Sequence, residues 1–325
     1  AMGLEVERTD RLLAVSGPKP QSHILTCHID RHGILYTNDH TFEYIAFVFR
    51  RPTDDPEDFF KLSKLQELGS RFVGQPVFAY DPETGQHLGS GVIEDALFSL
   101  QRQNLMFRID SSIDPKHQLN IFTPVSYAHI FFDDGNEFGG QIDNALSLGM
   151  VATLFKYGFE GTAIFTTEEE IGRSWIHLKN YLEHRNWEPK ELLVLDCSPY
   201  PTPYEAHVGD VVLRNRDAIG VFNHELLGRI RELCERANSP YCLQDEYVLA
   251  QNRERAEQGL PPLGLGRTEL GYLVRESQGR FNGITLQVPT YNYHSNRETT
   301  TWRAIEHMMR LLGLLVLPEA YREVL

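Results

Sequence analysis

Acidic residues and histidines recur where apolar runs of this chain end. The residues are His28 and Asp30, Glu168 to Glu170, Asp196 and His294. The apolar runs beside them span residues 23–30, 162–167, 192–196 and 284–288. Short, nearly continuous apolar runs of this kind are typical of buried strands. If these strands share one α/β sheet, their carboxyl ends line a common edge, and the charged residues are expected to meet there.

Asp143 adds a further carboxylate to this set, because it lies at the start of an expected helix in Gly139-Gly-Gln-Ile-Asp-Asn144. Carboxylates and imidazoles that gather away from water repel one another or lose hydration unless a cation holds them. Two histidines among carboxylates favour Zn²⁺ or a similar divalent ion, since Ca²⁺ prefers oxygen ligands alone. The sequence therefore indicates a divalent metal centre at this edge.

Each residue also has a purely structural interpretation. His28 alone is consistent with a hydrogen-bonded core histidine, and His294 with a loop histidine. The acidic run at 168–170 fits a solvated helix start, where the helix dipole favours negative charge. Asp143 and Asp196 fit helix or turn caps. Together these interpretations require several independent coincidences at one edge, which favours the metal centre.

The rest of the sequence supplies the elements that position these residues. From residue 143 onward, strand-like and helix-like patterns alternate, which predicts a sheet covered by helices. The expected helices span residues 145–155, 175–184, 222–238 and 300–317. Shorter apolar runs separated by turn residues, such as Asp81-Pro-Glu-Thr-Gly85, predict a small β-rich insert. We therefore expect a discontinuous main domain of residues 1–42 and 123–325, with residues 43–122 as the inserted domain.

Composition excludes several classes of protein. The chain has 325 residues, enough for about two domains, and its 41% hydrophobic content can build a sizeable core. Its 31 basic and 45 acidic residues give a net charge of −14, which argues against nucleic acid as a partner. No apolar run approaches the ~20 residues of a bilayer span. The four cysteines without paired spacing and the absence of a leader-like start predict a cytoplasmic location.

The ordered motifs resemble the tetrahedral, TET-type aminopeptidases, which are dinuclear zinc metallopeptidases of the glutamyl and leucyl aminopeptidase group. In chain order, the matching motifs are His-x-Asp at 28–30, Gly-x-x-Asp-Asn at 140–144, Glu-Glu-Ile-Gly at 169–172, Asp196, and Tyr-His-Ser-x-x-Glu at 293–298. The segment 209–217 and the helix expected at 222–238 also look like the family. The resemblance therefore covers nearly the whole chain, and the ordered set is far more specific than any single motif.

The resemblance implies a role for each residue and two divalent metal ions as cofactors, with Zn²⁺ preferred and Co²⁺ or Mn²⁺ as alternatives. Glu169 would act as the general base, and the Asp30 carboxylate would orient the ring of a metal-binding histidine. The implied metal ligands are Asp143 as a bridge, His28 and Asp196 at one ion, and Glu170 and His294 at the other.

The resemblance also implies the fold and the function. The fold would be a zinc aminopeptidase-like α/β architecture, in which helices sandwich a mixed sheet and a small β-barrel-like domain is inserted for dimerisation or as a lid. The enzyme would be an aminopeptidase that hydrolyses N-terminal residues from peptides, using a metal-bridging water and a glutamate base. Its partners would be peptide substrates and further copies of the chain, in a dimer-based assembly that extends to a dodecamer in the family.

The sequence departs from the family pattern at two positions. Asn144 replaces the acidic residue that follows the bridging aspartate, and Gly266-Arg-Thr-Glu269 replaces Gly-Gly-Thr-Asp. We expect the second change to affect the substrate pocket or assembly. Two other functions stay open: a related metal-dependent deacylase or carboxypeptidase of the same fold, and a metal-binding scaffold without turnover. The presence of Glu169 argues against the scaffold.

Overall fold

The computed structural model describes residues 3–37, 41–45, 65, 68–113, 119–128, 131–207 and 209–321. The chain divides into two compact units. The first comprises Ala1–Asp30, Phe132–Tyr293 and Thr299–Leu325, and the second comprises Arg31–Phe131 and His294–Glu298. The predicted insert at 43–122 falls in the second unit, although its stretches 46–64, 66–67 and 114–118 lie outside the described residues. The predicted domain boundaries stay a prediction.

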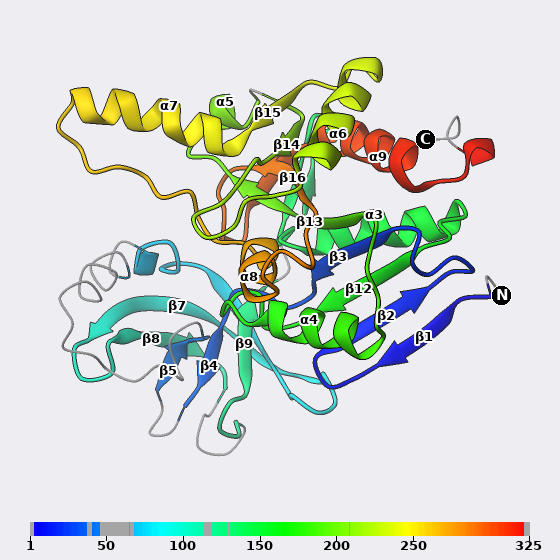
Figure 1. Ribbon diagram of the computed structural model, residues 1–325. Helices are drawn as coiled ribbons and strands as arrows, with labels where there is room; N and C mark the ends of the chain where they lie inside the picture. The colour runs from blue at the N-terminus through cyan, green and yellow to red at the C-terminus, as the bar shows by residue number, and fades with distance from the viewer. Residues whose placement is uncertain are drawn as a thin grey trace. The chain divides into compact units, whose positions relative to one another are not determined.

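The first unit is built on a mixed sheet of eight strands (Figure 1). In spatial order the strands are β1 (Glu5–Arg8), β2 (Leu12–Ser16), β12 (Thr162–Thr166), β3 (Ile24–His28), β13 (Leu192–Pro199), β16 (Ile284–Thr290), β14 (Val211–Leu213) and β15 (Tyr241–Leu243). Strands β12, β3, β13 and β16 run parallel to one another, whereas β12 is antiparallel to β2 and β16 is antiparallel to β14. Every residue of β3, β12 and β16 is buried, as their continuous apolar sequences predict for strands covered on both faces.

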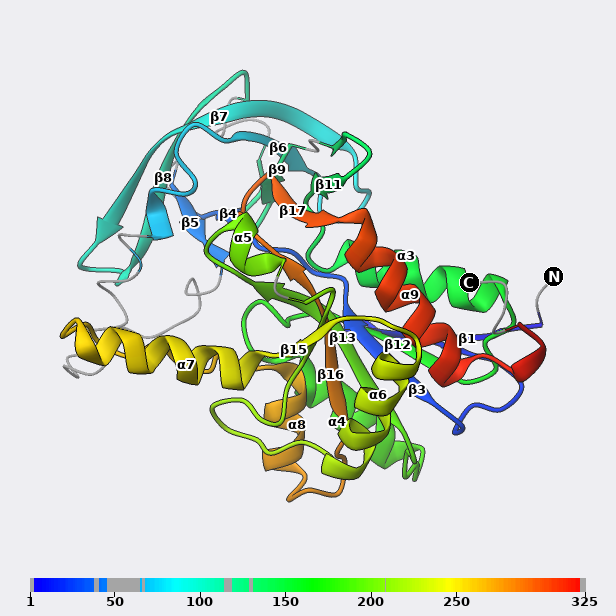
Figure 2. The same cartoon turned by 90° about the horizontal axis from the view of Figure 1, so that it is seen from above.

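Helices cover both faces of this sheet (Figures 1 and 2). Helices α3 (Ala145–Lys156) and α9 (Trp302–Val316) pack on one face, and α4 (Ser174–His184) and α8 (Glu269–Glu276) pack on the other. Further helical elements in the described part of the chain are α5 (Pro203–Ala206), α6 (His224–Arg236), α7 (Gln244–Glu257) and the 3-10 turn η2 (Glu319–Tyr321). A separate three-stranded sheet joins β10 (Phe132–Asp133), β11 (Glu137–Gly140) and β17 (Glu298–Thr301).

The second unit contains a closed six-stranded barrel. Around the barrel the strands are β4 (Ile34–Tyr36), β5 (Phe42–Tyr44), β8 (Asn104–Ser111), β7 (His87–Ser99), β6 (Pro76–Tyr80) and β9 (Pro124–Tyr127). Phe72, Ile93 and Leu105 are fully buried in its core. The turn between β6 and β7 is held by the Asp81 side chain, which accepts hydrogen bonds from the backbone N–H groups of Glu83 and Thr84.

The predicted fold class is confirmed: helices sandwich a mixed sheet, and a small barrel accompanies it. Local capping explains where two predicted helices begin. Helix α6 begins after Asn223, whose side chain accepts a hydrogen bond from the backbone N–H of Leu226. Helix α9 begins after Thr301, whose hydroxyl accepts a hydrogen bond from the backbone N–H of Ala304. Within the described part of the chain, no helix combines the length and the apolarity needed to cross a bilayer.

Candidate metal centre

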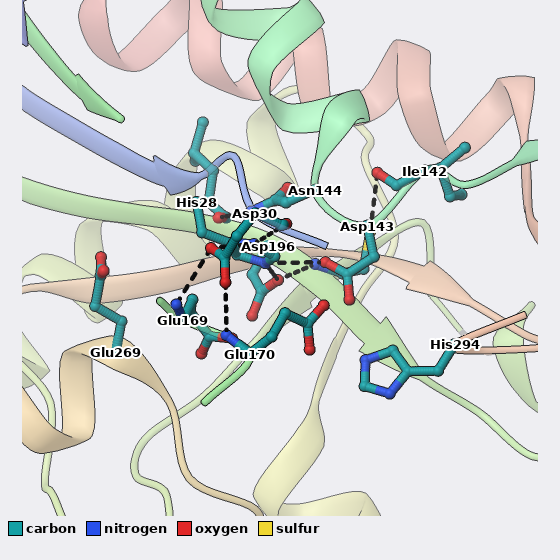
Figure 3. A network of polar contacts seen from close by, with 12 residues as sticks. His28, Asp30, Ile142, Asp143, Asn144, Glu169, Glu170, Asp196, Glu269 and His294 are labelled. Carbon is teal, nitrogen blue, oxygen red and sulfur yellow. Dashed lines mark hydrogen bonds and ion pairs between the residues drawn. The ribbon is translucent and has the colours of Figure 1, made fainter. Parts of the chain in front are cut away.

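Three predicted ligands converge at the carboxyl end of the central strands (Figure 3). His28 ends β3, Asp196 lies level with it on the adjacent strand β13, and Asp143 lies just before α3. The Nε2 atom of His28 is 3.1 Å from Asp143 Oδ1 and 3.6 Å from Asp196 Oδ1. One ligand atom from each residue lies within 4.8 Å of the others. One imidazole nitrogen and two carboxylate oxygens at this spacing suit a divalent ion such as Zn²⁺.

Asp30 connects the histidine to the turn that follows β12. Its carboxylate accepts hydrogen bonds from the backbone N–H groups of Glu169 and Glu170, each at 3.2 Å. The Nδ1 atom of His28 is 3.0 Å from the main-chain oxygen of Asp30 and 3.6 Å from its carboxylate. Because a carbonyl oxygen only accepts, Nδ1 carries a hydrogen in this contact. Nε2 faces Asp143 and the metal position, and its lone pair would bind an ion once the proton it shares with Asp143 is displaced.

The turn after β12 separates the three consecutive glutamates. Glu168 adopts a left-handed conformation with φ of +69°, and its carboxylate contacts Nε2 of His177 at 3.0 Å and the guanidinium of Arg11 at 3.5 Å. Glu169 and Glu170 lie beside the cluster (Figure 3). Contacts with His177 and Arg11 therefore account for Glu168, whereas Glu169 and Glu170 lie at the centre.

The electrostatics of the centre favour a cation. Burial raises the pKa of Glu169 to about 8; the charge of His28 opposes this shift, whereas Asp196 and Asp143 add to it. Burial also raises the pKa of Glu170 well above its ordinary value, and Asp143 adds to the shift. Burial by itself lowers the pKa of His28, but its hydrogen bond to Asp143 and the charge of that residue raise the pKa well above its ordinary value. Without a metal the cluster therefore retains protons, which a divalent ion would displace.

His294 belongs to the second unit, in the segment between β16 and β17. Its backbone N–H donates to the Glu298 carboxylate at 2.9 Å, and its carbonyl accepts from the Tyr127 hydroxyl at 3.2 Å. Its ring stacks on His32, with ring centroids 4.2 Å apart. The predicted pairing of His294 with Glu170 at one ion stays a prediction. His32 did not emerge from the sequence motifs, although it is a second histidine four residues after His28.

Asn144 and Glu269, the two departures from the family pattern, both support the centre. Asn144 donates to the main-chain oxygen of Leu195 at 2.7 Å, which ties the Asp143 turn to β13. Glu269 is buried, and its carboxylate accepts hydrogen bonds from the hydroxyls of Thr26 and Thr166, each at 2.8 Å. In the sequence, a buried partner for the hydroxyl groups of Thr26 and Thr166 is indicated because these threonines interrupt otherwise apolar strands.

Comparison with known proteins establishes the fold. No family model matches this chain, and no curated protein sequence does. Among solved structures, the PhTET1-12s dodecamer is 17% identical with a TM-score of 0.66, covering 97% of this chain and 89% of its own. A TET aminopeptidase from a marine sediment archaeon of the Thaumarchaeota is 14% identical with a TM-score of 0.67, covering 98% and 89%. The chain has the fold of a TET aminopeptidase. This likeness confirms the fold that the sequence motifs implied.

One similar structure has a different name. A Thermotoga maritima protein named as an endoglucanase is 14% identical with a TM-score of 0.60, covering 98% of this chain and 89% of its own. Glycoside hydrolysis commonly uses two carboxyl groups that flank the scissile bond. Here His28 lies between two carboxylates at ligand spacing. The donor set therefore fits metal chemistry better than glycoside hydrolysis.

Proposed function

We propose that this protein is a metal-dependent aminopeptidase that removes N-terminal residues from peptides. The observation that carries the proposal is the group formed by His28, Asp143 and Asp196, whose ligand atoms lie within 4.8 Å of one another at the carboxyl end of the sheet. The TET aminopeptidase fold supports it, because ligands of α/β sheets bind at this end of the strands.

The proposed cofactor is a pair of divalent ions, with Zn²⁺ preferred. In this proposal His28 and Asp196 hold one ion, Glu170 and His294 hold the other, and Asp143 serves both. The bound ions would polarise the scissile carbonyl and stabilise negative charge that develops on its oxygen. The imidazole nitrogens and carboxylate oxygens of this set are the donors that zinc accepts in hydrolases.

Glu169 is the proposed general base. Its carboxylate would take a proton from the attacking water and return that proton to the leaving amine. Its backbone N–H is held by Asp30, so the side chain starts from a fixed position beside the cluster.

The acidic character of the centre also suggests how the substrate is recognised. An ammonium group at the N-terminus of a peptide complements the carboxylates that surround the site, and a blocked terminus does not. We further propose that the chain forms homo-oligomers, because PhTET1-12s is a dodecamer. The deacylase or carboxypeptidase alternative uses the same metal donors and differs in the group recognised at the substrate terminus.

Paired substrates test this proposal directly. An aminoacyl anilide with a free amine and its N-acetylated counterpart are compared with and without a metal chelator. We expect the acetylated compound to be cleaved on the order of 10⁴-fold more slowly, because a polar recognition contact is lost, and we expect chelation to stop cleavage. Equal or faster cleavage of the acetylated compound would favour the deacylase. Metal binding without cleavage of either compound would favour the scaffold.

A further inference from the structure

Glu269 carries a buried carboxylate that contacts two strands leading to the metal centre, β3 and β12. It is the first residue of α8 and is 5% exposed. Its two oxygens accept separate hydrogen bonds, Oε1 from Thr26 and Oε2 from Thr166, each at 2.8 Å. The Ser174 hydroxyl acts on the same carboxylate and opposes the rise that burial causes in the pKa of Glu269. Three hydroxyl groups from three different elements therefore meet at one carboxylate.

These hydroxyl groups flank the functional residues in the chain. Thr26 lies on β3 two residues before His28, so both side chains are on the same face of the strand. Thr166 ends β12 and is the register partner of His28, and Glu169 follows three residues later. Ser174 begins α4, directly after the turn that carries Glu169. The carboxylate thus holds the strand that carries a ligand and both sides of the turn that carries the proposed base.

Helix α8 is itself firmly held where it begins. Thr268 caps the helix by accepting a hydrogen bond from the Gly271 backbone at 3.1 Å. The buried Asp217 carboxylate accepts hydrogen bonds from the backbone and hydroxyl of Thr268, both at 2.9 Å. A Cβ atom added at Gly271 would lie 1.9 Å from Asp217 Oδ2, so only glycine fits this contact. Glu269 therefore projects from a rigid support.

We propose that Glu269 is a positioning residue, which holds β3, β12 and α4 together through three hydroxyl groups so that His28 and Glu169 keep their places in the centre. The inference rests on the proposed function, in which these two residues bind metal and move the proton. Glu269 itself contacts neither the substrate nor the reacting atoms in this proposal.

A carboxylate suits this role better than an amide of the same size. Two carboxylate oxygens can accept from all three hydroxyl groups at once, whereas glutamine offers one oxygen acceptor and an NH₂ group that only donates. An amide nitrogen at either oxygen position would face a hydroxyl that now donates there. The Glu269→Gln variant therefore preserves volume and disturbs the hydrogen bonds, and Glu276→Gln at the exposed end of the same helix is its matched control.

The test measures kcat, KM and the affinity for Zn²⁺ alone, each per folded molecule, together with the melting temperature. For Glu269→Gln we expect kcat and Zn²⁺ affinity each to fall by about 10–100-fold, as is typical when a group that orients metal ligands is lost. KM should change little, and Glu276→Gln should match the wild type. Thr166→Val removes one donor with a side chain of similar shape and should lower kcat in the same direction.

A double-mutant cycle tests whether Glu269 and Thr166 are energetically coupled. If Glu269 acts through Thr166, the combined variant should lose less activity than the product of the two single losses. Should Glu269→Gln not fold, Thr26→Val and Thr166→Val carry the test alone. A lower melting temperature with unchanged kcat and Zn²⁺ affinity would overturn the proposal, as would independent effects in the cycle. Weakened Zn²⁺ binding in a protein that cleaves no peptide would support the positioning role and contradict the aminopeptidase function.

Discussion

The two ends of the central strands contain the same residue types in opposite electrostatic settings. At the amino end, Glu191 contacts His23 at 3.3 Å and forms an ion pair with Arg229, and these hydrogen bonds lower the pKa of Glu191. At the carboxyl end, burial raises the pKa values of Glu169 and Glu170. Acids balanced by neighbouring cations stabilise the fold, whereas buried acids in excess over cations mark a site that binds one.

Backbone packing reinforces this difference. At the amino end, a Cβ atom added at Gly283 would lie 2.1 Å from the main-chain oxygen of Leu192, and one at Gly161 would lie 2.3 Å from that of His23. These glycines allow the chain to close tightly over the amino ends of the strands. The carboxyl ends lead instead into turns with polar side chains, such as Asp30 and Glu169. The amino end of the sheet therefore contributes to stability, whereas the carboxyl end holds the residues proposed for catalysis.

At the carboxyl end of the strands, we expect the largest loss of kcat from Glu169→Gln. Loss of the proposed general base should lower kcat by at least ~100-fold, because such groups typically contribute 10²–10⁴. Bound metal, measured by elemental analysis, should stay near the wild-type level, since Glu169 is not a proposed ligand. The control is Glu168→Gln, because that carboxylate contacts His177 and Arg11 instead. Greater damage from the Glu168 variant would transfer the base role to Glu168.

The smallest effect is expected at the amino end of the strands. Glu191→Gln should lower the free energy of unfolding of the metal-free protein by about 1 kcal/mol at neutral pH, as for a partly exposed ion pair, and leave kcat unchanged. Because the folded-state pKa of Glu191 is below its ordinary value of 4.5, its contribution is present above that pH. It disappears as the pH falls through the lowered folded value.

Urea unfolding of both proteins at several pH values checks this expectation. The difference between wild type and Glu191→Gln should be largest near neutrality and should shrink in acid below pH 4.5. A difference that stays constant with pH would mean that the ionised form of Glu191 does not account for it. A loss of kcat in this variant would remove the distinction between the two ends of the sheet.

The sequence predicts the central sheet well because its strands are buried on both faces. The apolar patterns at 23–30, 162–167 and 284–288 correspond to the observed strands Ile24–His28, Thr162–Thr166 and Ile284–Thr290. Strands β14 and β15 have three residues each, too few to show a period, and α7 buries Gln244 and Asp245 instead of a regular apolar stripe. Such elements are determined by tertiary contacts, for example the hydrogen bond from the Asn215 backbone to Asp245.

The site could be predicted in outline for a similar reason. Residues at the carboxyl ends of parallel strands meet at one edge of a sheet, so the meeting of His28 and Asp196 needs only the strand pattern and residue chemistry. Asp143 joins them from the turn before α3. The role of Glu269 depends on hydroxyl partners 103 and 243 residues away in sequence. The stacking of His32 on His294 likewise depends on tertiary structure. No local pattern contains such contacts.

The amount of Zn²⁺ bound per chain tests the central claim most directly. Metal-free wild type, His28→Ala, Asp143→Ala and the exposed control His207→Ala are equilibrated with Zn²⁺ alone and analysed for metal. We expect two ions in the wild type and in His207→Ala, one ion in His28→Ala, and loss of both in Asp143→Ala, because a bridging carboxylate serves two ions and a terminal imidazole serves one. Full occupancy in Asp143→Ala would contradict the account.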